Sequence, residues 1–170
     1  MKVLFILISL LVLPPSLQEK EVMLRSEKKV NKYLAELWPD IEVITELLHD
    51  PYLDEREELY LLKSGDRPLG FLIVDQEMSK YDLFDYMVVF DRQGLIMKSH
   101  ILIYREDYGG EIASQRWLRQ FIGKSSRDPL ELRNDISGIS GATISCQSAC
   151  AGIKDLTRKI EHILSTHSDD

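Results

Sequence analysis

The chain has 170 residues, enough for one domain with a hydrophobic core and too few for two domains of typical size. With 44% hydrophobic and 29% charged residues, its composition is that of an ordinary globular protein. The formal net charge of -7 argues against nucleic-acid binding, because neutralising phosphates requires a basic face.

The N-terminal segment differs from the rest of the chain. Lys2 precedes an apolar run, Val3 to Leu13, and Pro14-Pro15-Ser16 follows. This pattern is typical of a secretory signal peptide, and the run is shorter than the roughly 20 apolar residues of a membrane span. The alternative is a buried first element of the fold. We expect residues 1–18 to be a signal peptide, cleaved or kept as a short N-terminal anchor, and the protein to be extracytoplasmic: periplasmic, or attached to the outer face of a membrane.

Residues 19–38 are expected to form a helix, because apolar side chains recur at three-to-four spacing among charges and Pro39 ends the pattern. The apolar positions are Val22, Val30, Tyr33, Leu34 and Leu37. This helix and the connector behind it make up residues 19–58.

Two hairpins are expected next. Apolar runs over 59–62 and 70–74 flank the turn sequence Lys63-Ser64-Gly65-Asp66-Arg67. Runs over 86–90 and 95–104 flank a second turn sequence, Asp91-Arg92-Gln93-Gly94. A loop over 106–110, a short helix over 114–122 with Ser114 as its cap, and a polar connector over 123–134 follow.

The clearest element is a C-terminal helix with one apolar stripe. The stripe consists of Cys146, Ala149, Cys150, Ile153, Leu156, Ile160, Ile163 and Leu164, and a polar tail over 165–170 follows. Hairpins between an N-terminal helix and a long C-terminal helix predict an α+β fold with an antiparallel sheet. Both cysteines are expected to be small buried side chains rather than a disulfide, and the four histidines lack the spacing of metal ligands.

The stretch ISGISGATISCQSAC, residues 136–150, carries more hydroxyls than the start of a helix needs. One reading is structural: Ser140 or Thr143 caps the helix, and the glycines allow a turn. The other is a phosphate site, because a helix N-terminus offers unpaired N–H groups and the positive end of the dipole. Hydroxyls of Ser140, Thr143 and Ser145 would add hydrogen bonds to such an anion. No Gly-Lys-[Ser/Thr] follows, so the stretch is not a Walker loop.

Ser140-Gly141-Ala142-Thr143-Ile144-Ser145 resembles the flavinylation motif of FMN-binding domains, which include the flavin-carrying subunits of sodium-pumping NADH:quinone oxidoreductase and of Rnf-type complexes. The resemblance implies that Thr143 carries FMN through a phosphoester bond. In that family the flavin is attached outside the cytoplasm by a flavin transferase that uses FAD.

The resemblance covers about residues 59–164 in order, and this segment is expected to be the FMN-binding domain. The family places a Glu-Thr-Pro-Gly-type loop after a strand, and here Glu106-Asp107-Tyr108-Gly109 follows Ile101 to Tyr104. A Gln-Phe-x-Gly-Lys stretch comes next in the family and matches residues 120–124. The family usually has an aspartate three residues before the motif serine. Here that position is Ser137, with Asp135 two residues earlier.

The cofactor implied is FMN, with Thr143, Ser140, Gly141, Ala142 and Ser145 as the binding residues and Glu106 and the Gly109-Gly110 backbone as further candidates. Glu106 could equally be an ordinary solvated carboxylate. The expected function is an electron carrier, rather than a self-sufficient enzyme, that passes electrons between redox partner proteins at or near a membrane.

Two alternatives stay open. One is a binding or interaction module on the same fold without covalent flavin. The motive for it is Ser137, which stands where the family usually has aspartate. The other is a hydrolase with Ser140 or Thr143 as nucleophile, which needs a histidine or lysine base; His100 would supply it only if the fold places it near Thr143.

Overall fold

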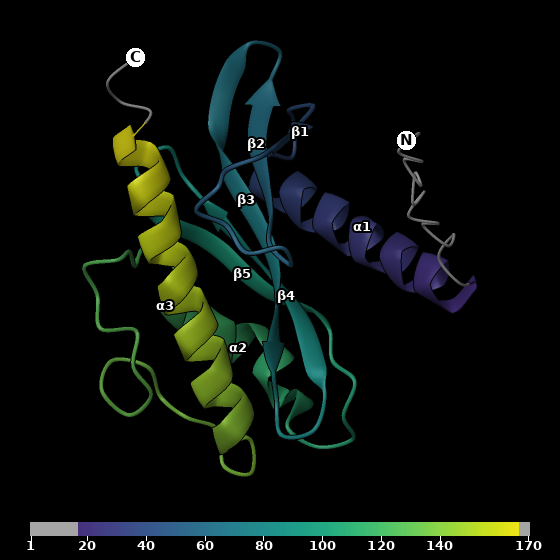
Figure 1. The fold of residues 1–170 in the computed structure, drawn as a ribbon, viewed down its shortest axis with the longest axis vertical. Helices are drawn as coiled ribbons and strands as arrows, with labels where there is room; N and C mark the ends of the chain where they lie inside the picture. Colours follow the sequence, from purple (N-terminus) through teal and green to yellow (C-terminus); the bar gives the residue numbers. More distant parts are fainter. Residues whose placement is uncertain (1–16, 167–170) are drawn as a thin grey trace, which may run out of the picture.

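The computed structural model describes residues 17–166, with side chains from residue 26 onward. The predicted signal segment therefore lies almost entirely outside the described residues. The described elements are α1 (Leu17–Leu37), β1 (Ile44–Leu48), β2 (Glu58–Ser64), β3 (Arg67–Met78), β4 (Leu83–Phe90), β5 (Ile96–Ile103), the short helices η1 (Gly110–Ala113), α2 (Gln115–Leu118) and η2 (Arg119–Phe121), and α3 (Thr143–Thr166) (Figure 1).

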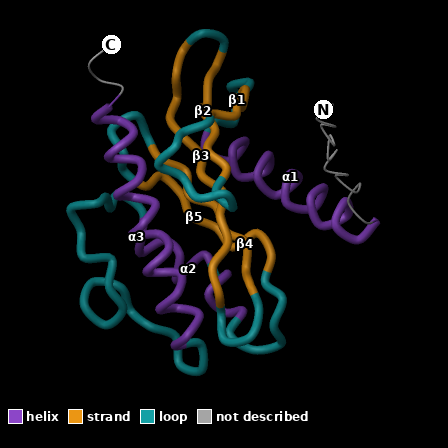
Figure 2. The backbone as a smooth tube through the Cα atoms, in the orientation of Figure 1, coloured by secondary structure: helices purple, strands orange, loops and turns teal. Residues whose placement is uncertain are grey.

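The strands form one five-stranded sheet in the order β1-β2-β3-β4-β5, and every neighbouring pair is antiparallel (Figure 2). Each strand pairs with the next one in the sequence, as hairpin connections require. The predicted α+β fold, with an antiparallel sheet between an N-terminal and a long C-terminal helix, is confirmed. Both predicted hairpins are present, as β2–β3 and β4–β5.

Strand β4 is covered on both faces, because alternate side chains of a strand point to opposite sides of the sheet. Phe84, Tyr86, Val88 and Phe90 belong to the core under α3. Met87 and Val89 belong to a second core that contains Leu34 of α1. The sheet therefore lies between α3 on one face and α1 on the other (Figure 1).

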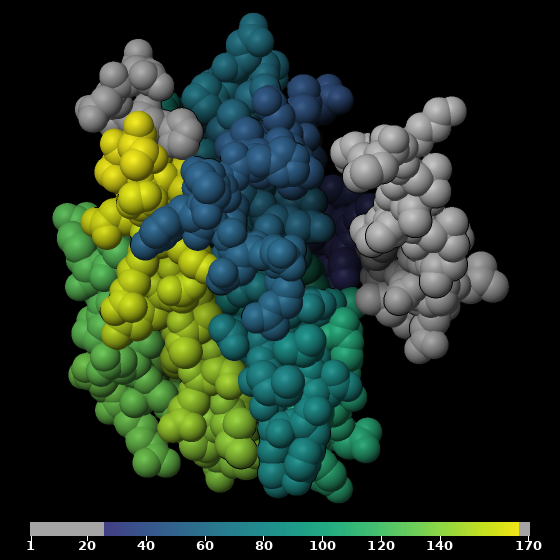
Figure 3. Space-filling model, in the orientation of Figure 1, coloured from purple at the N-terminus to yellow at the C-terminus, as the bar shows by residue number. Residues whose placement is uncertain are grey.

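The C-terminal helix packs as its sequence pattern predicts. Cys146, Ala149, Cys150, Ile153, Leu156, Ile160 and Ile163 are buried, and Leu164 packs against the same core while partly exposed. Both cysteines are free and buried, and burial raises the pKa of both thiols, that of Cys150 to about 12, which favours the protonated form. Residues of the green connector lie along one side of α3 and the teal strands along the other (Figure 3).

One element was not predicted. Residues 44–48, within the expected connector, form the edge strand β1, which pairs with β2 from Ile44↔Lys63 to Leu48↔Leu59. Four of its five side chains are exposed, so its sequence lacks the alternation of buried apolar and exposed polar residues that indicates a strand. Backbone hydrogen bonds to β2 form it instead.

Candidate functional site

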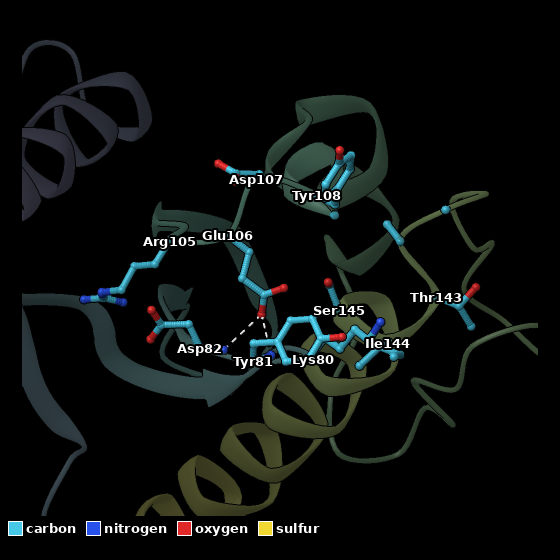
Figure 4. Close-up of a pocket in the computed structure, with 13 residues that line it drawn as sticks. Lys80, Tyr81, Asp82, Arg105, Glu106, Asp107, Tyr108, Thr143, Ile144 and Ser145 are labelled. Carbon is cyan, nitrogen blue, oxygen red and sulfur yellow. Dashed lines mark hydrogen bonds between the residues drawn. The ribbon is translucent and has the colours of Figure 1, made fainter.

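A cleft of about 700 Å³ lies at the N-terminal end of α3. Three segments line it: residues 80–82 between β3 and β4, residues 105–109 after β5, and residues 141–145 (Figure 4). The volume is within the range of small-molecule sites, about 300–1,000 Å³. Of the predicted site residues, Gly141, Ala142, Thr143, Ser145 and Glu106 line the cleft together, whereas Ser140 and Gly110 are outside its lining.

Thr143 is the first residue of α3, and its side chain is exposed at one end of the cleft. Ala142 precedes it, is buried, and accepts the first helical hydrogen bond from the Cys146 N–H at 2.9 Å. Ala142 is therefore the N-cap residue, and the alternative that Thr143 is the N-cap is wrong. Because alanine has no side-chain acceptor, it leaves the N–H groups of the first helical turn uncapped. That turn also carries no acidic residue.

Two glycines shape the backbone of the cleft. Gly141 has φ +86° and Gly109 has φ +91°, a left-handed conformation that side chains rarely adopt. A Cβ on Gly141 would meet no atom within 4 Å. A Cβ on Gly109 would collide with the Tyr104 hydroxyl and lie 2.7 Å from Ser145 Oγ. Gly109 is thus required by its neighbours as well as by its φ.

Three hydroxyls from separate segments meet beside the cleft, and we call Ser79, Tyr104 and Ser145 the hydroxyl cluster; the two serines are buried and Tyr104 is partly buried. Ser145 Oγ lies 2.8 Å from both Ser79 Oγ and the Tyr104 hydroxyl, and the latter two are 3.0 Å apart. Ser145 is only 4% exposed. Ser79 and Tyr104 were not among the predicted site residues, because nothing in their local pattern shows that the fold brings them to Ser145 from 66 and 41 residues away.

Glu106 holds the loop between β3 and β4. Its Oε1 accepts the backbone N–H groups of Tyr81 at 2.8 Å and Asp82 at 3.0 Å. These bonds, the Tyr81 bond foremost, lower the pKa of the Glu106 carboxyl and keep it ionised. Glu106 is therefore a structural anchor at the cleft rather than a free carboxylate.

The two basic side chains at the cleft differ in whether they are free to contact a ligand. Arg105 makes a bidentate ion pair with Asp85, with nitrogen–oxygen distances of 2.8 and 2.9 Å, and also donates to the Leu83 carbonyl. Lys80 instead lies over the ring of Tyr81, 4.7 Å from its centroid. A hydrogen bond with Tyr81 raises the pKa of Lys80, so this exposed ammonium stays charged.

Ser137 and Asp135 have different environments. Asp135 accepts the Lys124 ammonium at 2.8 Å and the backbone N–H groups of Leu130 and Glu131. Ser137 has an exposed side chain, while its backbone is held by the Trp117 indole N–H at 2.7 Å and by Gln120. The Asp135 carboxylate is thus already bonded within its own turn of the chain, and it does not replace an acid at position 137.

His100 lies beneath α1. The Gln115 amide donates to its Nδ1 at 2.8 Å, and its Nε2 lies 2.6 Å from the Tyr33 hydroxyl. Burial, together with the charges of Lys29 and Lys98, lowers its pKa to about 4. With both nitrogens occupied and no place in the cleft lining, His100 is not a base for Thr143. Lys80 does line the cleft, but its raised pKa keeps it protonated, so it is a poor base as well.

The chain matches no protein-family model and has no significant match to a curated protein sequence. Within residues 17–166, no helix has the length and apolar character needed to cross a membrane. The same residues contain no group of three or more His, Cys, Asp or Glu side chains arranged to hold a metal.

Proposed function

We propose that this protein is an exported electron carrier that holds FMN through a phosphoester on Thr143 and exchanges electrons with partner proteins at or near a membrane. The observation that carries the proposal is the position of Thr143: an exposed hydroxyl on the uncapped first turn of α3, at a cleft of about 700 Å³. This position agrees with the attachment threonine of the flavinylation motif that the sequence resembles.

The residues of the cleft suit a bound phosphate. The first-turn N–H groups of α3 and the positive end of its dipole favour an anion, and no acid of that turn opposes it. Gly141 lets the backbone approach an anion without a side chain in the way. Lys80 adds a positive charge to a lining that also contains the carboxylates of Asp82, Glu106 and Asp107, so the α3 end of the cleft is the part that suits the anion.

The local structure also favours one hydroxyl over its neighbours. Ser145 is buried in the hydroxyl cluster, with Ser79 and Tyr104 as its partners, so it is shielded from a transferase. Ser140 is exposed but outside the cleft lining. Thr143 is both exposed and part of the cleft, which makes it the accessible acceptor.

Bound FMN would supply the one- and two-electron redox chemistry, and the chain would bind and orient it. Attachment to Thr143 requires the FMN part of FAD to be transferred to the threonine oxygen, with the hydroxyl proton lost and AMP released. Outside the cytoplasm a dissociated flavin is diluted away, so mass action works against a noncovalent site. A covalent bond at Thr143 prevents that loss.

The decisive experiment is intact-mass measurement of the exported protein after co-expression with a flavin transferase. We expect a mass gain of FMN less one water, located on Thr143 by peptide mapping, and no gain when the transferase is omitted. Flavin located on Ser140 or Ser145 would overturn the choice of residue. No adduct in the presence of an active transferase would overturn covalent attachment.

A second candidate is a binding or interaction module that uses the same cleft without covalent flavin. The observation in its favour is Ser137, which stands where the resembling family usually has aspartate, together with the use of Asp135 by Lys124. Tight noncovalent binding of FMN, unchanged by Thr143→Ala, would favour this candidate.

A further inference from the structure

Two tyrosines at the cleft are far more exposed than large aromatic side chains usually are. Tyr81 is 77% exposed and Tyr108 is 84% exposed, and both line the cleft. They belong to different walls: Tyr81 to the loop between β3 and β4, and Tyr108 to the loop after β5. In Figure 4 Tyr108 lies above Ser145 and Tyr81 below it, with Thr143 to one side.

Although these side chains are exposed, their backbones are fixed. The Tyr81 N–H donates to Glu106 Oε1 at 2.8 Å. The Tyr108 carbonyl accepts the Tyr104 hydroxyl at 2.8 Å, and Tyr104 is itself part of the hydroxyl cluster. Because these backbones are already fixed, less backbone conformational entropy is lost when a ligand contacts the two side chains. Core packing does not explain either ring.

We propose that Tyr81 and Tyr108 are the aromatic pair that receives the planar ring system of the flavin, with Glu106 as the positioning residue for Tyr81. This inference rests on the proposed function, because it names the part of the same site that contacts the rings. Aromatic side chains stack on flat heteroaromatic rings with little dependence on ring substituents. Lys80 lies over one face of the Tyr81 ring, and the high exposure of that ring leaves the rest open to the ligand.

The test uses the full chain without attached flavin, titrated with riboflavin, which has the rings but no phosphate. We expect Tyr81→Leu and Tyr108→Leu each to weaken riboflavin binding about fivefold, the lower end of what one stacked aromatic side chain contributes. Tyr52→Leu is the matched control: Tyr52 is 49% exposed and stacks on His162, away from the cleft. Its affinity should equal that of the unchanged protein.

A second measurement uses protein loaded with flavin on Thr143. Stacked tyrosines quench flavin fluorescence, so the loaded protein should be dim, and the Tyr81→Leu, Tyr108→Leu double variant should be bright. Glu106→Leu should resemble Tyr81→Leu in both measurements. Glu106→Gln keeps an oxygen acceptor for the Tyr81 N–H and should restore the original behaviour.

The outcomes separate the two proposals. An adduct on Thr143 whose fluorescence is unchanged in the double variant overturns the aromatic pair and leaves the proposed function intact. Riboflavin binding that depends on Tyr81 and Tyr108 without any adduct supports the pair and overturns covalent attachment. A protein that neither binds riboflavin nor gains an adduct overturns both.

Discussion

The hydroxyl of Ser145 lies 2.8 Å from that of Ser79, whereas the hydroxyl-bearing side chain two residues earlier, Thr143, is exposed. Successive residues of an α-helix are rotated by about 100°, so residues two apart point to nearly opposite sides. The hydrogen bonds of Ser145 to Ser79 and Tyr104 therefore fix the rotation of the first turn of α3, and that rotation leaves Thr143 accessible.

The first prediction separates attachment from folding. Thr143→Ala should abolish covalent flavin and change the free energy of unfolding by no more than about 0.5 kcal/mol, because the side chain is exposed and is not the N-cap. Urea denaturation of the unloaded protein measures the stability, and intact mass measures the flavin. A variant that fails to fold would show that Thr143 has a structural role instead.

The second prediction concerns Ser137. If a transferase binds an acid at this position through a charge-assisted hydrogen bond, worth about 1.5 kcal/mol or more, Ser137→Asp should raise loading efficiency about tenfold. The exposed side chain leaves room for the change, and the backbone bonds from Trp117 and Gln120 do not depend on it. The measurement is the loading rate with a transferase from a family member that has the usual motif.

The matched control for that experiment is Ser140→Asp, which adds the same charge nearby at another exposed position. It should not accelerate loading. Equal rates for the unchanged protein and Ser137→Asp would show that the serine is a neutral variation.

The third prediction compares two glycines of the cleft. Gly141→Ala should destabilise the protein by about 1–2 kcal/mol, the strain of a left-handed alanine, because its Cβ meets nothing within 4 Å. Gly109→Ala should cost clearly more, since its Cβ also collides with Tyr104 and Ser145 of the hydroxyl cluster. Thermal or urea unfolding of the two unloaded variants checks the order. Equal losses would mean that the cluster moves aside without a penalty.

The fourth prediction is a pH dependence from His100. Burial first, then the nearby Lys29 and Lys98, lowers the folded-state pKa to about 4, against about 6.5 in the unfolded chain. The folded state thus binds the proton more weakly, so the stability that neutral His100 contributes is fully present above about pH 6.5 and falls as the pH drops toward 4.

His100→Gln cannot titrate in this range, so its free energy of unfolding should fall less than that of the unchanged protein between about pH 7 and pH 5. The charged groups that face His100 are Lys29, Lys32 and Glu36 from α1 and Lys98 from β5, and they are the same in both proteins. Parallel pH profiles would show that His100 does not carry this dependence.

Much of the fold was predictable because its signals are local. The apolar stripe of α3 recurs at helical spacing, and the turns of both hairpins contain glycine next to aspartate or glutamine. The edge strand β1 was not predictable in this way, since four of its five side chains are exposed and its pairing with β2 is a long-range contact. Strand β4 also begins earlier than predicted, at Leu83, because Arg105 pairs with Asp85 and makes a carboxylate acceptable within the strand.

At the site, the hydroxyl-rich stretch before α3 and the candidate Thr143 could be identified from the sequence, because both are properties of adjacent residues. Which polar groups are used in packing depends instead on long-range contacts: Ser145 is buried against Ser79 and Tyr104, and Glu106 holds the backbone of Tyr81. The same packing placed Tyr81 and Tyr108 at one cleft with Thr143. These contacts join residues 25 to 66 positions apart in the sequence. A local sequence pattern does not indicate which distant segments the packing of the core brings into contact.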